Sequence, residues 1–73
     1  MNALELINFG TNELRRKKID TSRLDSELLL SKILDKNREE ILINLEQKIC
    51  QKYFLKYKQL IRRRSQCEPI AYI

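Results

Sequence analysis

The chain is poor in residues that break helices and in residues that bind metals. Its 73 residues include one glycine, one proline, two cysteines, and no histidine or tryptophan. Without histidine or a Cys-x-x-Cys pair, the sequence has no recognisable zinc site. The scarcity of glycine and proline, with 34% charged and 42% hydrophobic residues, favours helices with short connections. The predicted fold class is all-α, a small bundle of four to five helices.

Long apolar runs are also missing. None approaches the roughly 20 residues that cross a bilayer, and the N-terminus lacks the basic segment and apolar core of a signal peptide. We therefore expect a cytoplasmic protein without membrane contact. In that compartment Cys50 and Cys67 are expected to be buried or incidental thiols, with a disulfide or a redox role as the weaker alternatives.

The charge balance is basic, with 15 Lys and Arg against 10 Asp and Glu, for a net charge of +5. Such an excess attracts acidic partners, either nucleic acid or an acidic protein surface. The acidic residues are interspersed with the basic ones, however, so a solvated helical surface accounts for most of the charge. A cluster at 15–18 (Arg-Arg-Lys-Lys) also complements the dipole at the end of the first predicted helix.

Apolar residues at spacings of three and four predict the first two helices. The first covers about residues 3 to 18, with Asn2 as N-cap, and its Gly10 marks a close helix crossing or a bend. The second begins at Ser22, where Ser22 and Asp25 fit a loose capping box. Its many leucines cover more than one stripe, which predicts a central helix surrounded by the others.

Two further helices follow. Asn37 and Glu40 repeat the capping signature for a short helix that ends near residue 45. A long amphipathic helix is predicted from about residue 47 to residue 64, with its aromatic rings on the apolar face and therefore in the core. Its opposite face is basic.

The last residues differ from an ordinary domain end. Pro69 stops the preceding helix, and the chain then finishes on four apolar or aromatic residues at 70–73. We interpret residues 1–66 as a helical substrate-recognition bundle and residues 67–73 as the start of a connector. On this interpretation the chain is a fragment, and a catalytic domain lies downstream.

Two sequence blocks carry a resemblance to a known family. Residues 25–30 (Asp-Ser-Glu-Leu-Leu-Leu) are similar to Asp-Ala-Glu-x-Leu-Leu, and residues 63–73 are similar to Arg-Arg-x-x-Gly-Glu-Pro-x-x-Tyr-Ile. Both patterns belong to the N-terminal domain of the release factor glutamine methyltransferases, the HemK/PrmC family. One departure is Cys67, where the family has the glycine that suits a left-handed helix end.

The resemblance implies a helical domain joined to an α/β domain that binds S-adenosylmethionine. The family methylates the glutamine of the Gly-Gly-Gln motif in peptide chain release factors, using an Asn-Pro-Pro-Tyr motif that this sequence does not contain. We therefore expect no catalytic, cofactor-binding or metal-binding residue in this chain, and no enzyme activity from the chain alone. The expected partners are a release factor and the catalytic domain of the same protein.

Docking on an acidic release factor is assigned to Arg15, Arg16, Lys17 and Lys18 or, alternatively, to the basic face of the last helix. Asp25 and Glu27 are interpreted as capping residues on a solvated first turn. The connector residues Glu68, Pro69 and Tyr72 complete the candidate functional positions.

Two other functions stay open beside this one. A small basic helical module that binds nucleic acid is the main alternative, although nucleic acid is an unfavoured partner. A purely structural interaction domain, docking through an apolar surface, is the other.

Overall fold

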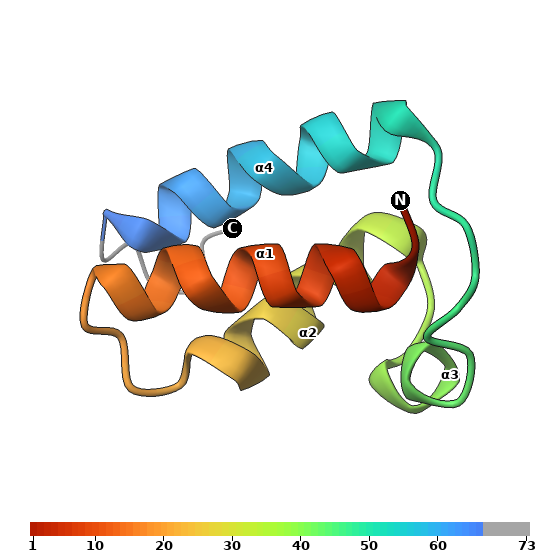
Figure 1. Cartoon of the computed structure of the whole chain (residues 1–73), viewed down its shortest axis with the longest axis horizontal. Coiled ribbons are helices and arrows are strands. Elements are labelled where there is room, and N and C mark those ends of the chain that lie inside the picture. The colour runs from red at the N-terminus through yellow and green to blue at the C-terminus, as the bar shows by residue number, and fades with distance from the viewer. Residues whose placement is uncertain (67–73) are drawn as a thin grey trace.

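The computed structural model describes residues 1–66, which form four helices. They are α1 (Ala3–Arg16), α2 (Ser22–Leu34), α3 (Arg38–Leu42) and α4 (Gln51–Ser65), as Figure 1 shows. Within these residues the only β-type pairing is an isolated bridge between Asn2 and Lys48. The predicted all-α fold class is confirmed.

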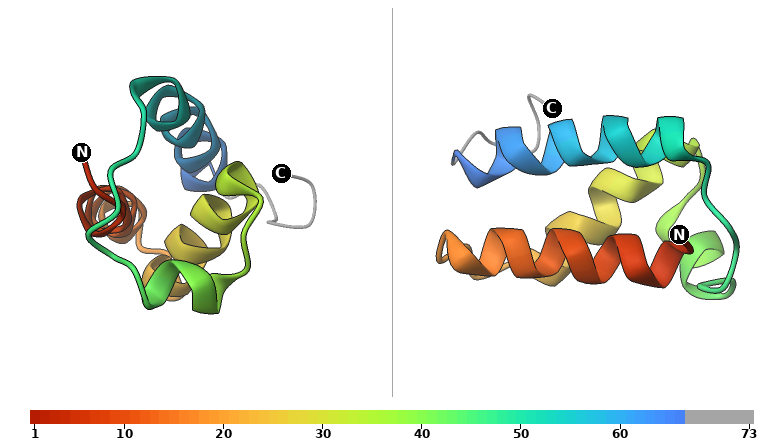
Figure 2. Two further views of the ribbon diagram at one scale, coloured as in Figure 1. Left: turned by 90° about the vertical axis from the view of Figure 1, so that its right-hand side faces the viewer. Right: turned by 45° about the horizontal axis from the view of Figure 1, so that its top comes forward.

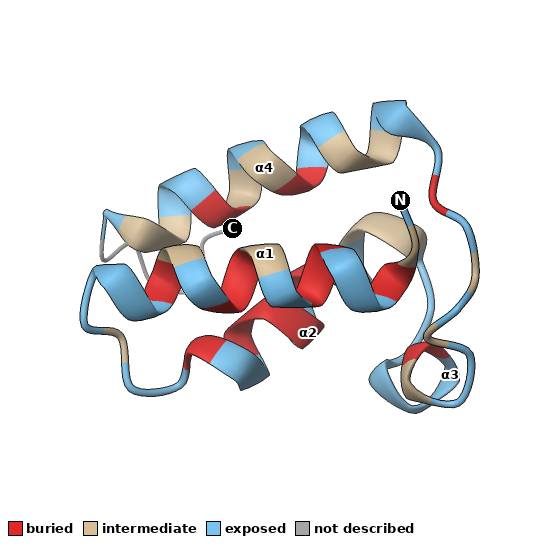
Figure 3. Cartoon of the chain, in the orientation of Figure 1, coloured by how far each residue is buried: buried red, intermediate tan, exposed pale blue. Residues whose placement is uncertain are grey.

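The three long helices form the body of the molecule, and the short α3 lies at one end. Helices α1 and α4 run side by side in the same direction, while α2 runs back against both (Figures 1 and 2). No helix within the described residues has the length and hydropathy that crossing a membrane requires. The core between the helices consists of Ala3, Leu6, Ile7, Leu14, Leu29, Leu30, Ile41, Ile49, Tyr57 and Ile61 (Figure 3).

The starts of α1 and α3 follow from local signals. The Asn2 side chain accepts a hydrogen bond from the Glu5 backbone at 2.8 Å, and the Glu5 carboxylate accepts one from the Asn2 backbone at 3.0 Å. Asn37 and Glu40 form the same reciprocal box at the start of α3. Each box satisfies backbone N–H groups that have no partner inside the helix. Both predicted N-caps are confirmed.

The start of α2 is built differently from the prediction. Ser22 is the first helical residue rather than the cap, and the N-cap Thr21 makes no side-chain hydrogen bond to the helix backbone. Instead, the Thr21 hydroxyl donates to a carboxylate oxygen of Asp25 at 2.9 Å. The predicted Ser22–Asp25 capping box is wrong, because the Asp25 carboxylate is used for contacts within the fold.

The connection between α3 and α4 is longer than predicted, since α3 ends at Leu42 and α4 begins at Gln51. The backbone of this connection pairs with the N-terminus. Ala3 N–H donates to the Gln47 carbonyl at 3.0 Å, and Ile49 N–H donates to the Met1 carbonyl at 2.8 Å. This pairing joins residues far apart in sequence, so helical periodicity gave no sign of it.

Gly10 marks a close crossing of three helices, which was one of the two alternatives for this glycine. A Cβ atom at this position would lie 2.3 Å from the hydroxyl oxygen of Tyr57 and 2.9 Å from the hydroxyl oxygen of Ser26. The buried Tyr57 hydroxyl donates to the Ser26 carbonyl at 3.2 Å, and burial raises the pKa of Tyr57 above its ordinary value. Tyr53 and Phe54 pack partly buried against the core, as predicted for the aromatic rings of this helix.

The apolar packing of α2 is narrower than predicted. Leu24 and Leu28 are 40% and 38% exposed, so the first half of α2 is not the all-round apolar helix that its leucines suggest. Its buried positions are occupied by Ser22, Asp25, Ser26 and Glu27. The two carboxylates are buried against cations of other helices, Arg38 for Glu27 and Arg64 for Asp25. The Ser26 hydroxyl donates to the Ser22 carbonyl within α2 and lies at the close crossing beside Gly10.

Candidate functional site

Two carboxylates are buried near the start of α2. Asp25 is 5% exposed and Glu27 is 4% exposed, so their predicted place on a solvated first turn is wrong. A buried carboxylate is stable only when cations or hydrogen-bond donors compensate for the water it loses. Each of the two is therefore expected to have a cationic partner.

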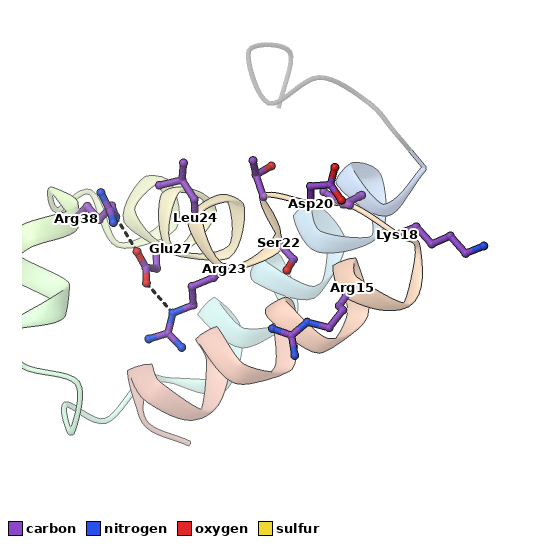
Figure 4. A pocket seen from close by; sticks show the side chains of 10 residues that line it. Arg15, Lys18, Asp20, Ser22, Arg23, Leu24, Glu27 and Arg38 are labelled. Atoms are coloured by element: carbon purple, nitrogen blue, oxygen red, sulfur yellow. Dashed lines mark hydrogen bonds and ion pairs between the residues drawn. The ribbon is translucent and has the colours of Figure 1, made fainter.

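Glu27 holds two arginines at once. Its Oε2 accepts a hydrogen bond from Nε of Arg23 at 2.7 Å, and its Oε1 accepts one from Nε of Arg38 at 2.7 Å. Arg23 lies one turn earlier on α2, whereas Arg38 begins α3. Figure 4 shows the carboxylate between the two guanidinium groups. The pair of bonds therefore fixes α3 against α2 and fixes both guanidinium groups in place.

The electrostatic balance at Glu27 favours the charged carboxylate. Burial raises the pKa of this carboxyl, but hydrogen bonds and charge attraction from Arg23 and Arg38 outweigh burial, and the net pKa lies below its ordinary value. Glu27 is therefore ionised at neutral pH, and its negative charge is balanced by the positive charges of Arg23 and Arg38.

Asp25 ties α2 to the last turn of α4. Its Oδ2 accepts a hydrogen bond from Nε of Arg64 at 2.9 Å, between side chains that are 7% and 19% exposed. The same oxygen receives the Thr21 hydroxyl. This ion pair fixes the end of α4, the helix that leads into the predicted connector.

An open depression of about 590 Å³ lies between the end of α1 and the start of α2. Its charged lining consists of four cations and two carboxylates, namely Arg15, Lys18, Arg23, Arg38, Asp20 and Glu27. In Figure 4 the Glu27 carboxylate of α2 lies between Arg38 of α3 and Arg23 of α2, Arg15 projects from α1, and the Lys18 side chain points outward. Because Glu27 is neutralised by its partners, the depression presents a positive surface. We call it the Glu27 depression.

The structure separates the four residues of the predicted docking cluster. Arg15 and Lys18 line the Glu27 depression. Arg16 instead pairs with Glu13 at 3.2 Å on the exposed side of α1, and Lys17 is the exposed C-cap. Two of the four predicted docking residues therefore lie at the Glu27 depression and two lie outside it.

The turn after α1 accounts for this separation. Helix α1 ends at Arg16 rather than near residue 18, and Lys18 adopts the left-handed conformation with φ of 61°. Lys18 N–H donates to the Arg15 carbonyl, and Ile19 N–H donates to the Leu14 carbonyl, which is a Schellman ending. A lysine at this position costs about 1 kcal/mol relative to glycine.

Sequence reasoning missed the cations that Glu27 holds. The spacing of Arg23 and Glu27, four residues apart on one helix, was a readable signal for an ion pair. Arg38 gave no such signal, because it comes from another helix and its approach depends on how α3 packs.

A second cationic surface lies on the outer face of α4, the predicted basic face. Its exposed cations are Lys52, Lys56, Arg62 and Arg63, and α4 contains no Asp or Glu. Lys52 Nζ lies 5.2 Å from the ring centroid of Tyr53. Within residues 1–66, Lys52, Lys56 and Arg62 form no ion pair with a carboxylate.

No group of three or more His, Cys, Asp or Glu side chains in residues 1–66 is placed to hold a metal ion. Cys50 is an exposed free thiol, so the expectation of a buried thiol is wrong for it. The connector residues Glu68, Pro69 and Tyr72 and the second cysteine, Cys67, lie outside the described residues.

Comparison with known protein families decides the classification. The family model described as the PrmC N-terminal domain matches residues 5–73. The chain belongs to this family. The resemblance seen in the two sequence blocks is thereby confirmed across nearly the whole chain.

Individual relatives agree with the PrmC N-terminal domain assignment. A release factor glutamine methyltransferase of Leptospira interrogans is 33% identical over 70 residues, which are 96% of this chain and 24% of that protein. The enzyme of the same name from Clostridium botulinum is 38% identical over 69 residues, 94% of this chain and 24% of that protein. A bifunctional methyltransferase of Rickettsia felis is 30% identical over 69 residues, 94% of this chain and 13% of that protein.

The chain thus spans a quarter or less of the length of these relatives. No solved structure matches it at a significant level.

Proposed function

We propose that the chain is the substrate-recognition domain of a protein methyltransferase that modifies the glutamine of the Gly-Gly-Gln motif in peptide chain release factors. The observation that carries the proposal is its membership of the PrmC N-terminal domain family over residues 5–73. Methyl transfer and the binding of S-adenosylmethionine belong to a catalytic region outside this chain. The proposal places the domain in the cytoplasm, where release factors act.

The chemistry explains why such an enzyme needs a recognition domain. A glutamine amide is a weak nucleophile, so the reaction depends on placing its nitrogen accurately against the methyl donor. Binding energy from parts of the substrate far from the glutamine contributes to that placement. A rigid helical domain that grips the release factor elsewhere supplies such energy without touching the reacting atoms.

The direct test compares the complete methyltransferase with a variant that lacks residues 1–66. Each enzyme is assayed on two substrates, the whole release factor and a short peptide. We expect deletion to lower kcat/KM for the whole release factor by at least about tenfold. Methyl transfer to a short peptide that holds only the Gly-Gly-Gln motif should change little, which serves as the control for an intact catalytic region. An equal loss on both substrates would overturn the recognition role.

One observation favours the nucleic-acid alternative, namely the outer face of α4 with its exposed cations and no acidic residue in the helix. If that face binds phosphates, affinity for an RNA or DNA duplex should fall steeply as salt rises, with a slope set by the number of phosphates contacted. Binding of a duplex that exceeds binding of a release factor at 150 mM salt would favour this alternative.

A further inference from the structure

Glu27 holds two arginines of the depression in place while engaging only one N–H donor of each. Arg23 and Arg38 each donate through Nε to Glu27, and their side chains remain 48% and 47% exposed. A guanidinium group has four further N–H donors on its two terminal nitrogens. Within residues 1–66, the terminal nitrogens of Arg23 and Arg38 form no hydrogen bond, since both side chains bond to Glu27 through Nε. Both groups therefore present donors to the outside from a fixed position.

Fixing the two groups matters for affinity. A long side chain on an open surface loses rotamer freedom when a ligand immobilises it, and that loss weakens binding. Here the folded protein has already ordered both arginines through the buried Glu27 carboxylate. A planar guanidinium also matches a carboxylate in two parallel hydrogen bonds. The Glu27 depression is therefore preorganised for carboxylate or phosphate groups.

The surroundings favour a protein partner over nucleic acid. Leu24 lines the same depression and is 40% exposed, and Leu28, one turn later on α2, is 38% exposed. Arginine beside apolar side chains is typical of protein interfaces. Phosphate backbones give no apolar surface to cover these leucines, whereas an acidic segment of a protein offers both carboxylates and apolar side chains.

We propose that Arg23 and Arg38, held by Glu27 and joined by Arg15, bind carboxylate side chains of an acidic segment on the release factor. This inference rests on the proposed function and names the docking surface for it. It replaces the four consecutive cations of the predicted docking cluster by a set drawn from three helices. Only Arg15 is common to both sets as a contact residue. Lys18 lines the depression but its side chain points outward, Arg16 pairs with Glu13, and Lys17 lies outside the depression.

The test compares two double variants that remove the same amount of charge. Arg23→Gln with Arg38→Gln removes two cations from the depression, and Lys52→Gln with Lys56→Gln removes two from the outer face of α4. Affinity of the 73-residue chain for a release factor is measured by isothermal titration calorimetry at 150 mM salt. We expect the arginine variant to bind about 30-fold more weakly or worse, and the lysine variant to bind within about fivefold of the unsubstituted chain.

Because the arginine variant leaves Glu27 buried without its partners, a triple variant that also carries Glu27→Gln guards against loss of folding. It should remain folded by circular dichroism and show the same weakened binding. Equal losses in the arginine and lysine variants would overturn the docking surface while leaving the proposed function in place. Failure of the unsubstituted chain to bind the release factor would overturn both.

Discussion

The Glu27 depression and the outer face of α4 both carry several cations, but they hold them in different ways. In the depression a carboxylate that is 4% exposed accepts Nε–H from two arginines, so the guanidinium positions are fixed by the fold. On α4, Lys52 and Lys56 lie one turn apart on a helix without acidic residues. Like charges at this spacing repel by about 0.2–0.5 kcal/mol.

The difference teaches that the number of cations does not define a binding site. Flexible cations on an exposed face attract an anionic partner from a distance and raise its association rate. Cations fixed by a buried carboxylate make short, oriented contacts that slow dissociation. We therefore expect the outer face of α4 to steer a partner and the Glu27 depression to hold it.

The largest effect is expected from removing the carboxylate that organises the depression. Glu27→Gln takes the charged acceptor away from both arginines and should lower the free energy of unfolding by about 2–3 kcal/mol. Urea denaturation followed by circular dichroism measures this change. The matched control on the other region is Lys56→Gln, which should change stability by less than about 0.5 kcal/mol. Equal changes in the two variants would remove the distinction between fixed and flexible cations.

A smaller effect is expected at Asp25, the buried carboxylate that holds Arg64 of α4. Asp25→Asn keeps the size of the side chain but weakens the 2.9 Å contact with Arg64, and should cost about 2 kcal/mol of unfolding free energy. The same denaturation experiment measures it. A loss as small as that of Lys56→Gln would show that burial of the carboxylate does not decide how strongly a cation is held.

The third prediction concerns pH. The pKa of Glu27 is lowered in the folded protein and returns to about 4.5 on unfolding, so the unfolded chain binds more protons as the solution becomes acidic. The stability that this group contributes is therefore present above about pH 5 and is lost as pH falls through the lowered pKa. Urea denaturation from pH 7 to pH 3 should show a shallower loss in Glu27→Gln than in the unsubstituted chain. Parallel curves would contradict the ion-pair account.

The smallest effect is expected on association kinetics. Lys52→Gln with Lys56→Gln should slow the association of a release factor by about two- to fivefold, with dissociation unchanged and the difference disappearing at high salt. Arg23→Gln with Arg38→Gln should instead speed dissociation. Surface plasmon resonance at 50 and 300 mM salt separates the two. A faster dissociation in the lysine variant would mean that α4 also makes close contacts.

The sequence predicted the parts of the fold that depend on neighbouring residues. Asn2 and Asn37 cap their helices as expected, because a capping box is complete within four residues. Gly10 was predicted to mark a close helix crossing or a bend, and the structure places Tyr57 against it. The family could also be recognised from two short blocks, and the match over residues 5–73 confirms it.

What the sequence did not predict depends on contacts between distant elements. Asp25 and Glu27 occupy the first turns of a helix, where carboxylates are normally solvated. Their burial depends on Arg38 and Arg64, which lie 11 residues beyond Glu27 and 39 residues beyond Asp25. Similarly, the pairing of the N-terminus with residues 45–49 shortened two predicted helices. Helical periodicity carries no information on such contacts.

The most direct test of the Glu27 depression is to follow the arginine side chains themselves. A chain labelled with ¹⁵N-arginine is titrated with a release factor, and the Nε–H signals are recorded by nuclear magnetic resonance. We predict that the signals of Arg23 and Arg38 shift or broaden on binding while that of Arg62 on α4 stays in place. A shift confined to Arg62, with Arg23 and Arg38 unchanged, would contradict the account.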